Sequence, residues 1–196
     1  MKRQPIVAFL RGINVGGHRV KMDRLRELFT ELGLRDVATF IASGNVVFST
    51  ESRDVHELRE QIEAHLEENL GYEVATFLRS PEELAAITVF RPAGGGLREV
   101  GPEEDRAPAS EASHYVMFVD APVPKTLRSN LAELDSETDR FHFSEGEVHW
   151  ILQGKLSESP LFGSVMDRAT RGFRTTTRNM NTLRRIAAKV APSGPS

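Results

Sequence analysis

A glycine-rich stretch near the start of the chain carries residue types that bind anions. It spans residues 11–17, Arg-Gly-Ile-Asn-Val-Gly-Gly, and we expect it to link a strand at Ile6–Arg11 to a helix at Met22–Leu32. Free N–H groups and the dipole at a helix start attract anions, and glycines let a phosphate approach the backbone closely. The candidate ligand-binding residues of this stretch are Arg11, Asn14, Gly16 and Gly17.

The same stretch also has a purely structural interpretation. Its glycines follow neither the GxGxxG nor the GxxxxGKS/T spacing of known phosphate loops. A tight loop in which glycine supplies positive φ and Asn14 bonds its own backbone explains the pattern as well. Ser43-Gly44-Asn45 has the same two interpretations, and there a hairpin turn accounts for the residue types.

A second polar cluster lies near the end of the chain, at residues 175–181, Thr-Thr-Thr-Arg-Asn-Met-Asn. We expect it to start a last helix with Thr177 as its N-cap, which would place Arg178 beside free N–H groups where it can hold a phosphate or carboxylate. A hydroxyl-rich helix start is also simply a good cap. The candidate ligand-binding residues here are Thr177, Arg178, Asn179 and Asn181.

Charge is distributed unevenly along the chain. Residues 1–26 carry seven basic side chains and one acidic one, and residues 168–190 carry seven basic side chains and no acidic one. Because the whole chain has a net charge of −3, residues 27–167 sum to −16. Such asymmetry indicates an anionic partner or an internal electrostatic match. We hypothesise that the two basic ends meet at one anionic ligand.

Several kinds of site are excluded or disfavoured. The chain has no cysteine, which rules out disulfides, thiolate metal sites and thiol nucleophiles. Its six histidines include no HExxH pattern, and no GxSxG elbow is present, so we expect no metal site, no cofactor and no serine hydrolase. His142 and His149 are expected to face each other across a hairpin. No stretch is long enough to span a membrane, and we expect a cytoplasmic protein without a membrane partner.

The elements that must position these residues form an α+β pattern. The first half predicts β-α-β-β-α-β, with strands at Ile6–Arg11, Val37–Ala42, Val46–Ser49 and Glu73–Leu78 and helices at Met22–Leu32 and Asp54–Leu70. This order is that of a ferredoxin-like unit. In that unit we expect the hairpin at Ser43-Gly44-Asn45 and the loop after the first strand to lie at opposite ends of the sheet. A single site using both is therefore not expected.

The second half predicts a related unit. A helix that starts at Ser80 with a capping box is followed by residues 91–113, which we expect to be either a lid or disordered, the composition favouring disorder. The order after that is β-α-β-β-α, without a final strand. The predicted domains are 1–79, a ferredoxin-like subdomain; 80–113, a helix and flexible polar linker; 114–190, a second α+β subdomain; and 191–196, a disordered tail.

Three segments together resemble one family. They are FLRGINVGGHRVKM at 9–22, FIASGNVVFS at 40–49 and TTTRNMNTLRRIA at 175–187, and their order and spacing are similar to those of the bacterial domain of unknown function 1697 family. The resemblance implies a bacterial α+β protein of two small subdomains. The family has no assigned activity, so the resemblance implies a fold and not a function.

Four functions stay open at this level. The first is binding of a small anionic ligand. The second is binding of RNA or single-stranded nucleic acid on a ferredoxin-like sheet, with Phe9 and Phe48 as stacking rings, although the RNP1 pattern is absent. The third is a small phosphoryl- or acyl-transfer enzyme. The fourth is a scaffold whose basic ends pair with its own acidic body. The sequence predicts no oligomeric state.

Overall fold

The computed structural model describes residues 3–14, 17, 19–40, 44–91 and 112–191. The predicted lid or linker at 91–113 and the predicted tail at 191–196 fall almost entirely outside these residues. The chain divides into two compact units, residues 1–86 with 186–196 and residues 87–185. Each unit is described by itself.

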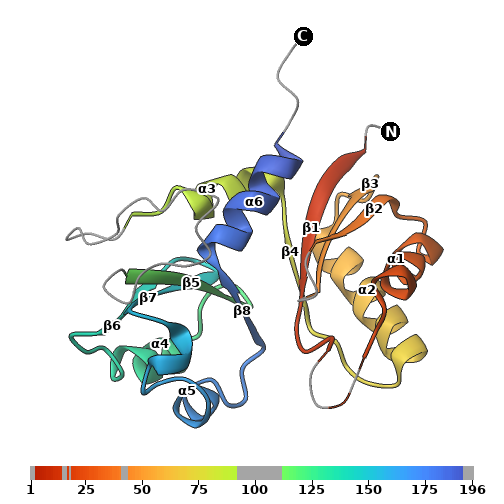
Figure 1. The fold of residues 1–196 in the computed structure, drawn as a ribbon. Helices are drawn as coiled ribbons and strands as arrows, with labels where there is room; N and C mark the ends of the chain where they lie inside the picture. Colours follow the sequence, from red (N-terminus) through yellow and green to blue (C-terminus); the bar gives the residue numbers. More distant parts are fainter. Residues whose placement is uncertain (1–2, 15–16, 18, 41–43, 92–111, 192–196) are drawn as a thin grey trace. The chain divides into compact units, whose positions relative to one another are not determined.

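The first unit is a four-stranded antiparallel sheet with two helices. Its elements are β1 (Gln4–Leu10), α1 (Met22–Glu31), β2 (Arg35–Phe40), β3 (Asn45–Thr50), α2 (Val55–Leu70) and β4 (Thr76–Arg79). The strand order is β2-β3-β1-β4, and α1 and α2 cover one face of the sheet (Figure 1). This is the ferredoxin-like arrangement, and the α+β prediction for the first half is confirmed.

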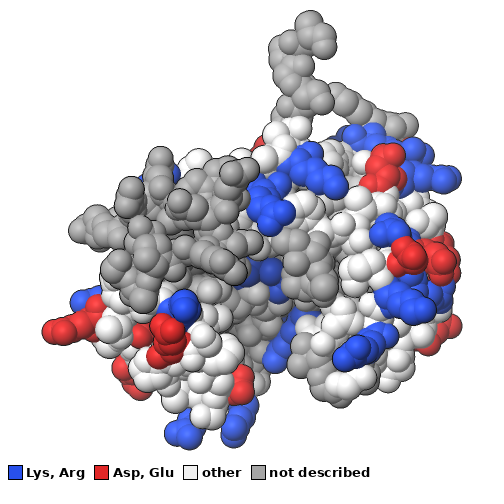
Figure 2. All heavy atoms as spheres, in the orientation of Figure 1, with Lys and Arg blue, Asp and Glu red and all other residues white. Residues whose placement is uncertain are grey.

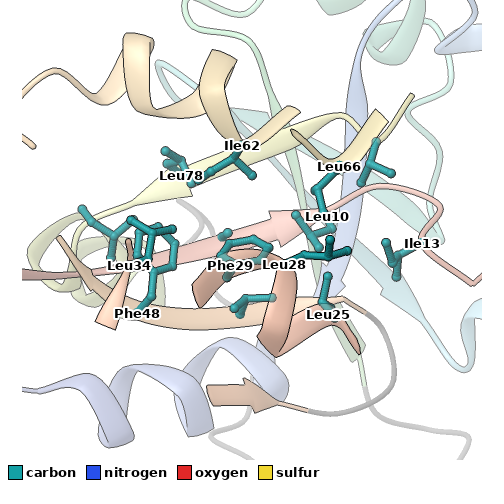
Figure 3. Packing of buried hydrophobic residues seen from close by; sticks show 14 of the residues in the cluster. Leu10, Ile13, Leu25, Leu28, Phe29, Leu34, Phe48, Ile62, Leu66 and Leu78 are labelled. Carbon is teal, nitrogen blue, oxygen red and sulfur yellow. The ribbon is translucent and has the colours of Figure 1, made fainter. Parts of the chain in front are cut away.

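The hydrophobic core of the first unit lies between the sheet and its helices. Because side chains alternate along a strand, β1 directs Ile6, Ala8 and Leu10 into one cluster with buried leucine, isoleucine and phenylalanine side chains from α1 and α2 (Figure 3). The rings of Phe29 and Phe48 lie 5.5 Å apart in this cluster. The ring of Phe29, on α1, and the ring of Phe48, on β3, are therefore both used in packing the core.

The stacking platform suggested for nucleic acid is not available. Phe9 and Phe48 are both 0% exposed, so neither ring can lie against a base. The interpretation was wrong because a strand position alone does not reveal which face of the sheet is covered.

The second unit repeats the topology of the first. Its elements are β5 (Ala112–Val119), α4 (Lys125–Ala132), β6 (Asp139–Phe143), β7 (Glu147–Gln153), the 3₁₀ turn η1 (Leu156–Glu158), α5 (Ser164–Ala169) and β8 (Thr175–Asn179). The strand order β6-β7-β5-β8 corresponds position by position to that of the first sheet. Two helices join the units in the chain, α3 (Pro81–Thr88) and α6 (Met180–Val190).

The expectation that the second half lacks a final strand was wrong. Residues Thr175–Asn179 form β8 and pair with β5, for example Val116 opposite Arg178. The last helix begins only at Met180, so Thr177 is a strand residue and not an N-cap. Three consecutive threonines fit a strand because β-branched side chains pack well on a pleated sheet. The hydroxyl groups had favoured a cap instead.

The helices α2 and α3 both begin with a side-chain cap, of which the sequence predicted the one at Ser80. Asp54 caps α2 by accepting from the backbone N–H groups of His56 and Glu57, both at 2.9 Å. At the start of α3 the backbone N–H of Ser80 donates to the Glu83 carboxylate at 2.7 Å, and the N–H of Glu83 donates to Ser80 Oγ at 3.2 Å. This reciprocal pair is the expected capping box.

Gly44 occupies a position that no other residue fits without strain. Its φ is +76°, and a Cβ there would lie 2.7 Å from Ile13 Cγ2 and 3.1 Å from Leu10 Cβ. Gly33 has a similar φ of +77°, but a Cβ there would meet nothing within 4 Å. An alanine at Gly33 would therefore suffer backbone strain alone, whereas an alanine at Gly44 would suffer backbone strain and a steric clash.

Gly33→Ala should lower the free energy of unfolding by about 1 to 2 kcal/mol, the strain of a left-handed backbone. Gly44→Ala should lower it further, by about another 1 to 3 kcal/mol, because the side chain also overpacks a closed loop. Urea denaturation of both variants measures the difference. Equal losses would show that Ile13 and Leu10 yield to the added methyl group.

Candidate functional site

Two of the candidate loops lie at the same end of the first sheet. The backbone N–H of Leu10, the last residue of β1, donates to the carbonyl of Gly44 at 2.8 Å, and Phe9 lies opposite Asn45 in the register. The expectation that the β1–α1 loop and the β2–β3 turn lie at opposite ends was wrong. Since β1 and β2 are both antiparallel to β3, they run in the same direction, and their C-terminal ends lie at the same end of the sheet.

The β1–α1 loop is held by bonds to its neighbours. Asn14 Oδ1 accepts from the backbone N–H of Val20 at 2.7 Å, which closes the loop across six residues. The Tyr72 hydroxyl donates to the carbonyl of Ile13 at 3.1 Å, and the Ile13 side chain is buried. Asn14 therefore bonds a backbone group, as the structural interpretation predicted, but that group belongs to Val20 and not to Asn14 itself.

The glycines of the loop have the backbone conformation that the structural interpretation predicted. Gly12 has φ +67° and Gly17 has φ +92°, and nothing lies within 4 Å of a Cβ built on either. Gly16 falls outside the described residues. Open space beside a positive-φ glycine leaves the backbone accessible to a ligand.

The sequence of the loop contains basic side chains and no acidic ones. Between residues 11 and 22 the sequence contains Arg11, Arg19 and Lys21 and no carboxylate, and all three lie on the surface. Lys21 occupies the N-cap position of α1, where it supplies no capping side-chain bond. The Lys21 side chain therefore does not satisfy the first N–H groups of α1.

Three other cations of the basic N-terminal segment, Arg3, Arg24 and Arg26, are paired within the unit. Arg3 lies 3.3 Å from Glu51, and Arg26 pairs with Asp23. Acidic and basic side chains accordingly stand side by side on the surface of this unit (Figure 2). The net +6 of residues 1–26 therefore overstates the charge available to a ligand.

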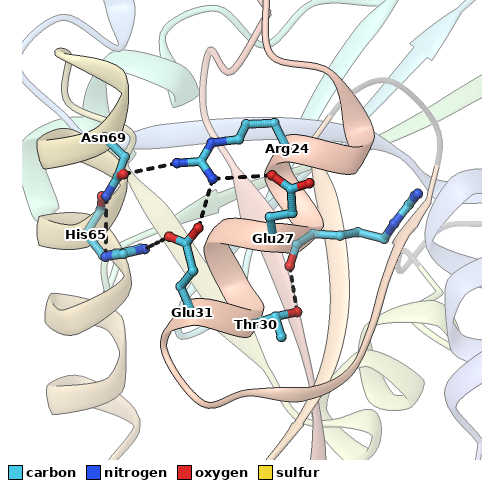
Figure 4. Close-up of polar contacts among 7 residues, drawn as sticks. Arg24, Glu27, Thr30, Glu31, His65 and Asn69 are labelled. Atoms are coloured by element: carbon cyan, nitrogen blue, oxygen red, sulfur yellow. Dashed lines mark hydrogen bonds and ion pairs between the residues drawn. The ribbon is translucent and has the colours of Figure 1, made fainter.

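Arg24 is part of a polar network that joins the two helices of the first unit (Figure 4). Its guanidinium bonds Glu31 at 2.8 Å, Glu27 at 3.3 Å and Asn69 of α2 at 3.1 Å. His65 Nε2 bonds the same Glu31 carboxylate at 3.1 Å. The hydrogen bond with Glu31 raises the pKa of Arg24, and the same bond lowers the pKa of Glu31. This network pairs the Arg24 charge with carboxylates of its own unit.

The third candidate segment lies in the second unit. Arg178 is buried in β8, where its guanidinium donates to Thr176 Oγ1 at 2.8 Å and to the carbonyl of Thr177 at 2.9 Å. Burial lowers its pKa to about 10. At the start of α6 the Oδ1 of Asn179 accepts from the backbone N–H of Asn181 at 2.8 Å. Asn179 thus takes the capping role that was predicted for Thr177.

The candidate residues therefore form two groups. Arg11, Asn14 and Gly17 belong to one loop of the first unit, and the other group, Thr177, Arg178, Asn179 and Asn181, belongs to the β8–α6 junction of the second. Convergence of the groups on one ligand stays a prediction.

Sequence reasoning missed a buried histidine pair in the second unit. His114 Nε2 and His149 Nδ1 lie 3.0 Å apart. The register also places His142 opposite His149, as predicted. Alternation along the hairpin indicated that second pairing, but the contact of His114 depends on β5 pairing with β7, which no local pattern reveals.

The described part of the chain was compared with the geometry of metal sites and of membrane-spanning helices. No group of three or more His, Cys, Asp or Glu side chains there is arranged to hold a metal ion. Among those same residues, no helix has both the length and the apolar character needed to cross a bilayer.

Comparison with known proteins gives one family and one fold. The family model described as "Protein of unknown function (DUF1697)" matches residues 3–149, which confirms the resemblance. The structure of conserved bacterial protein SP0830 from Streptococcus pneumoniae is similar, with a TM-score of 0.70 and 21% identity over 97% of this chain and 100% of that chain. At this identity the likeness shows the fold alone. No curated protein matches.

Asn14→Ala should lower the free energy of unfolding by about 1 kcal/mol, because Val20 loses its hydrogen-bond acceptor. Asn14→Asp retains an acceptor at the same position and should stay within about 0.5 kcal/mol of the unaltered chain. Urea denaturation distinguishes the two. A fully stable Asn14→Ala variant would mean that this bond does not hold the loop.

Proposed function

The chain belongs to the DUF1697 family of proteins of unknown function, and we propose that it binds a small anionic ligand, bearing a phosphate or a carboxylate, at the β1–α1 loop. The single observation that carries the proposal is the charge of this loop. Arg11, Arg19 and Lys21 precede an α1 start that has no side-chain cap, and no carboxylate lies between residues 11 and 22. Cations and free N–H groups at a helix start together stabilise a bound anion.

The second unit supports the proposal by contrast. Its β5–α4 loop occupies the topological position of the β1–α1 loop. Residues 120–124 there read Asp-Ala-Pro-Val-Pro, with one acid and no base, and Asp120 lies 4.0 Å from Arg174. The fold therefore does not require a basic, glycine-rich loop at this position, and the charge of the β1–α1 loop needs a reason other than folding.

The β8–α6 group lies in the second unit, and its part in binding stays a prediction separate from the loop. Arg178 is buried, and its guanidinium donates to Thr176 Oγ1 and to the carbonyl of Thr177. Thr177, Asn179 and Asn181 carry the neighbouring polar groups.

The proposal includes a cytoplasmic location, where phosphorylated and carboxylated metabolites are plentiful.

Arg19→Ala should weaken the binding of such an anion about tenfold, because one charge-assisted contact contributes about 1.5 kcal/mol. Arg35→Ala is the matched control, since Arg35 is also exposed but lies at the start of β2. Calorimetric titration at low salt with inorganic phosphate, nucleoside monophosphates, sugar phosphates and dicarboxylates measures both variants.

Three outcomes are informative. Loss with Arg19→Ala alone supports the loop as the site. Equal loss with both variants means that binding reports only surface charge and would contradict the proposal. Absence of binding across the panel contradicts it as well.

A further inference from the structure

One face of the second sheet carries histidines covered by a phenylalanine. Phe90, two residues after α3, stacks on the ring of His149 with centroids 3.7 Å apart and ring planes 13° apart. It also lies 6.0 Å from the His114 ring and 5.9 Å from the His142 ring. His149 is 1% exposed and His114 is 8% exposed. Phe90 is therefore part of what shields the histidine pair from water.

The hydrogen-bond pattern of the pair indicates its protonation state. Nδ1 of His114 is buried and, among the described residues, has no hydrogen-bond partner. A buried N–H without an acceptor is less tolerable than a bare ring nitrogen. We therefore assign the hydrogen of His114 to Nε2, which donates to His149 Nδ1 at 3.0 Å. Both rings are then neutral, and His149 carries its hydrogen on Nε2.

An added proton has no favourable position in this arrangement. It must go to the buried Nδ1 of His114, where no acceptor lies, or to Nδ1 of His149, where it breaks the bond between the rings. Among the residues that the structure describes, the charges that act on His114 are all basic: His149 of β7, His142 of β6, Arg184 of α6 and Arg91 after α3. None of these neighbours offers a negative charge, so the imidazolium gains hydration only if its cover moves away.

We propose that the His114–His149 pair and Phe90 form a pH-sensitive latch. When both rings are neutral, Phe90 lies over the pair and holds residues 89–91 on the sheet face. When the pair takes up a proton, Phe90 leaves His149 and residues 89–91 are released. Attraction between a cation and a ring face favours the closed state, but it replaces only part of the lost hydration of a buried imidazolium.

The direction of the pH dependence follows from the shifts. Burial lowers the pKa of His149 to about 4 and that of His114 to about 3, from an ordinary value of 6.5. An open or unfolded chain binds protons more readily than the closed one over this range. The closed state is therefore fully favoured above pH 6.5 and is progressively lost as the pH falls toward 4.

The test uses the absence of cysteine from the chain. Val89, next to Phe90, is 68% exposed, and Val55 in α2 is 46% exposed. Val89→Cys and Val55→Cys each accept one nitroxide spin label, whose mobility is measured from pH 8 to pH 4. We expect the label at residue 89 to become mobile, reversibly, with a midpoint between about 6.5 and 4, while the label at residue 55 and the far-ultraviolet circular dichroism stay unchanged.

Variants of the histidines identify the responsible ring. His149→Phe keeps an aromatic surface for Phe90 but cannot titrate, and in the Val89→Cys background it should abolish the transition. His142→Phe is the matched control and should keep it. A transition that persists in His149→Phe, a label that never becomes mobile, or simultaneous loss of circular dichroism would overturn the proposal.

A second measurement tests the latch even if the His149→Phe variant fails to fold. Imidazole ¹⁵N spectra of the otherwise unaltered Val89→Cys chain follow each histidine ring directly. The His114–His149 pair should take up its proton over the pH range in which the label becomes mobile. A pair that stays neutral across that range would overturn the latch.

Discussion

The antiparallel pairing of β1 with β3 is the constraint on which the candidate site depends. The register runs from Gln4 opposite Thr50 to Phe9 opposite Asn45. A shift of one residue would turn the core-facing side chains of β1 toward the other face of the sheet. The same register brings the carbonyl of Gly44 to the N–H of Leu10. Packing of the core and convergence of the two loops therefore have one cause.

The two units show which features the fold requires and which it does not. Both sheets have the same strand order, and both bury one set of alternating side chains under helices. Beyond this they differ: the first unit has a basic loop after its first strand, whereas the second has an acidic loop there and a histidine pair on its sheet. The shared topology explains neither feature, and these differences are where function is to be sought.

Local patterns predicted much of the fold, and non-local pairings account for what was missed. The helix predicted at Asp54–Leu70, found at Val55–Leu70, and the capping box of α3 both follow from residues within a few positions of one another. β8 was missed because a run of threonines suits both a cap and a strand, and only its pairing with β5 decides between them. The position of the β2–β3 turn was predicted wrongly because it depends on the directions of β1 and β2, which both pair antiparallel with β3. The candidate residues of the β1–α1 loop were identified from the sequence, but the bond of Asn14 to Val20 was not.

Binding at the β1–α1 loop is the central claim, and two-dimensional ¹H–¹⁵N spectra recorded during titration with inorganic phosphate test it most directly. The account predicts that the amide signals of Gly12 and Gly17 move in a saturable manner, and that those of Gly44 and Asn45, across the strand end, move with them. Signals of the second sheet's β6–β7 hairpin should serve as an internal reference. Shifts that do not saturate, or that spread over exposed arginines and lysines elsewhere while the loop stays unchanged, would contradict it.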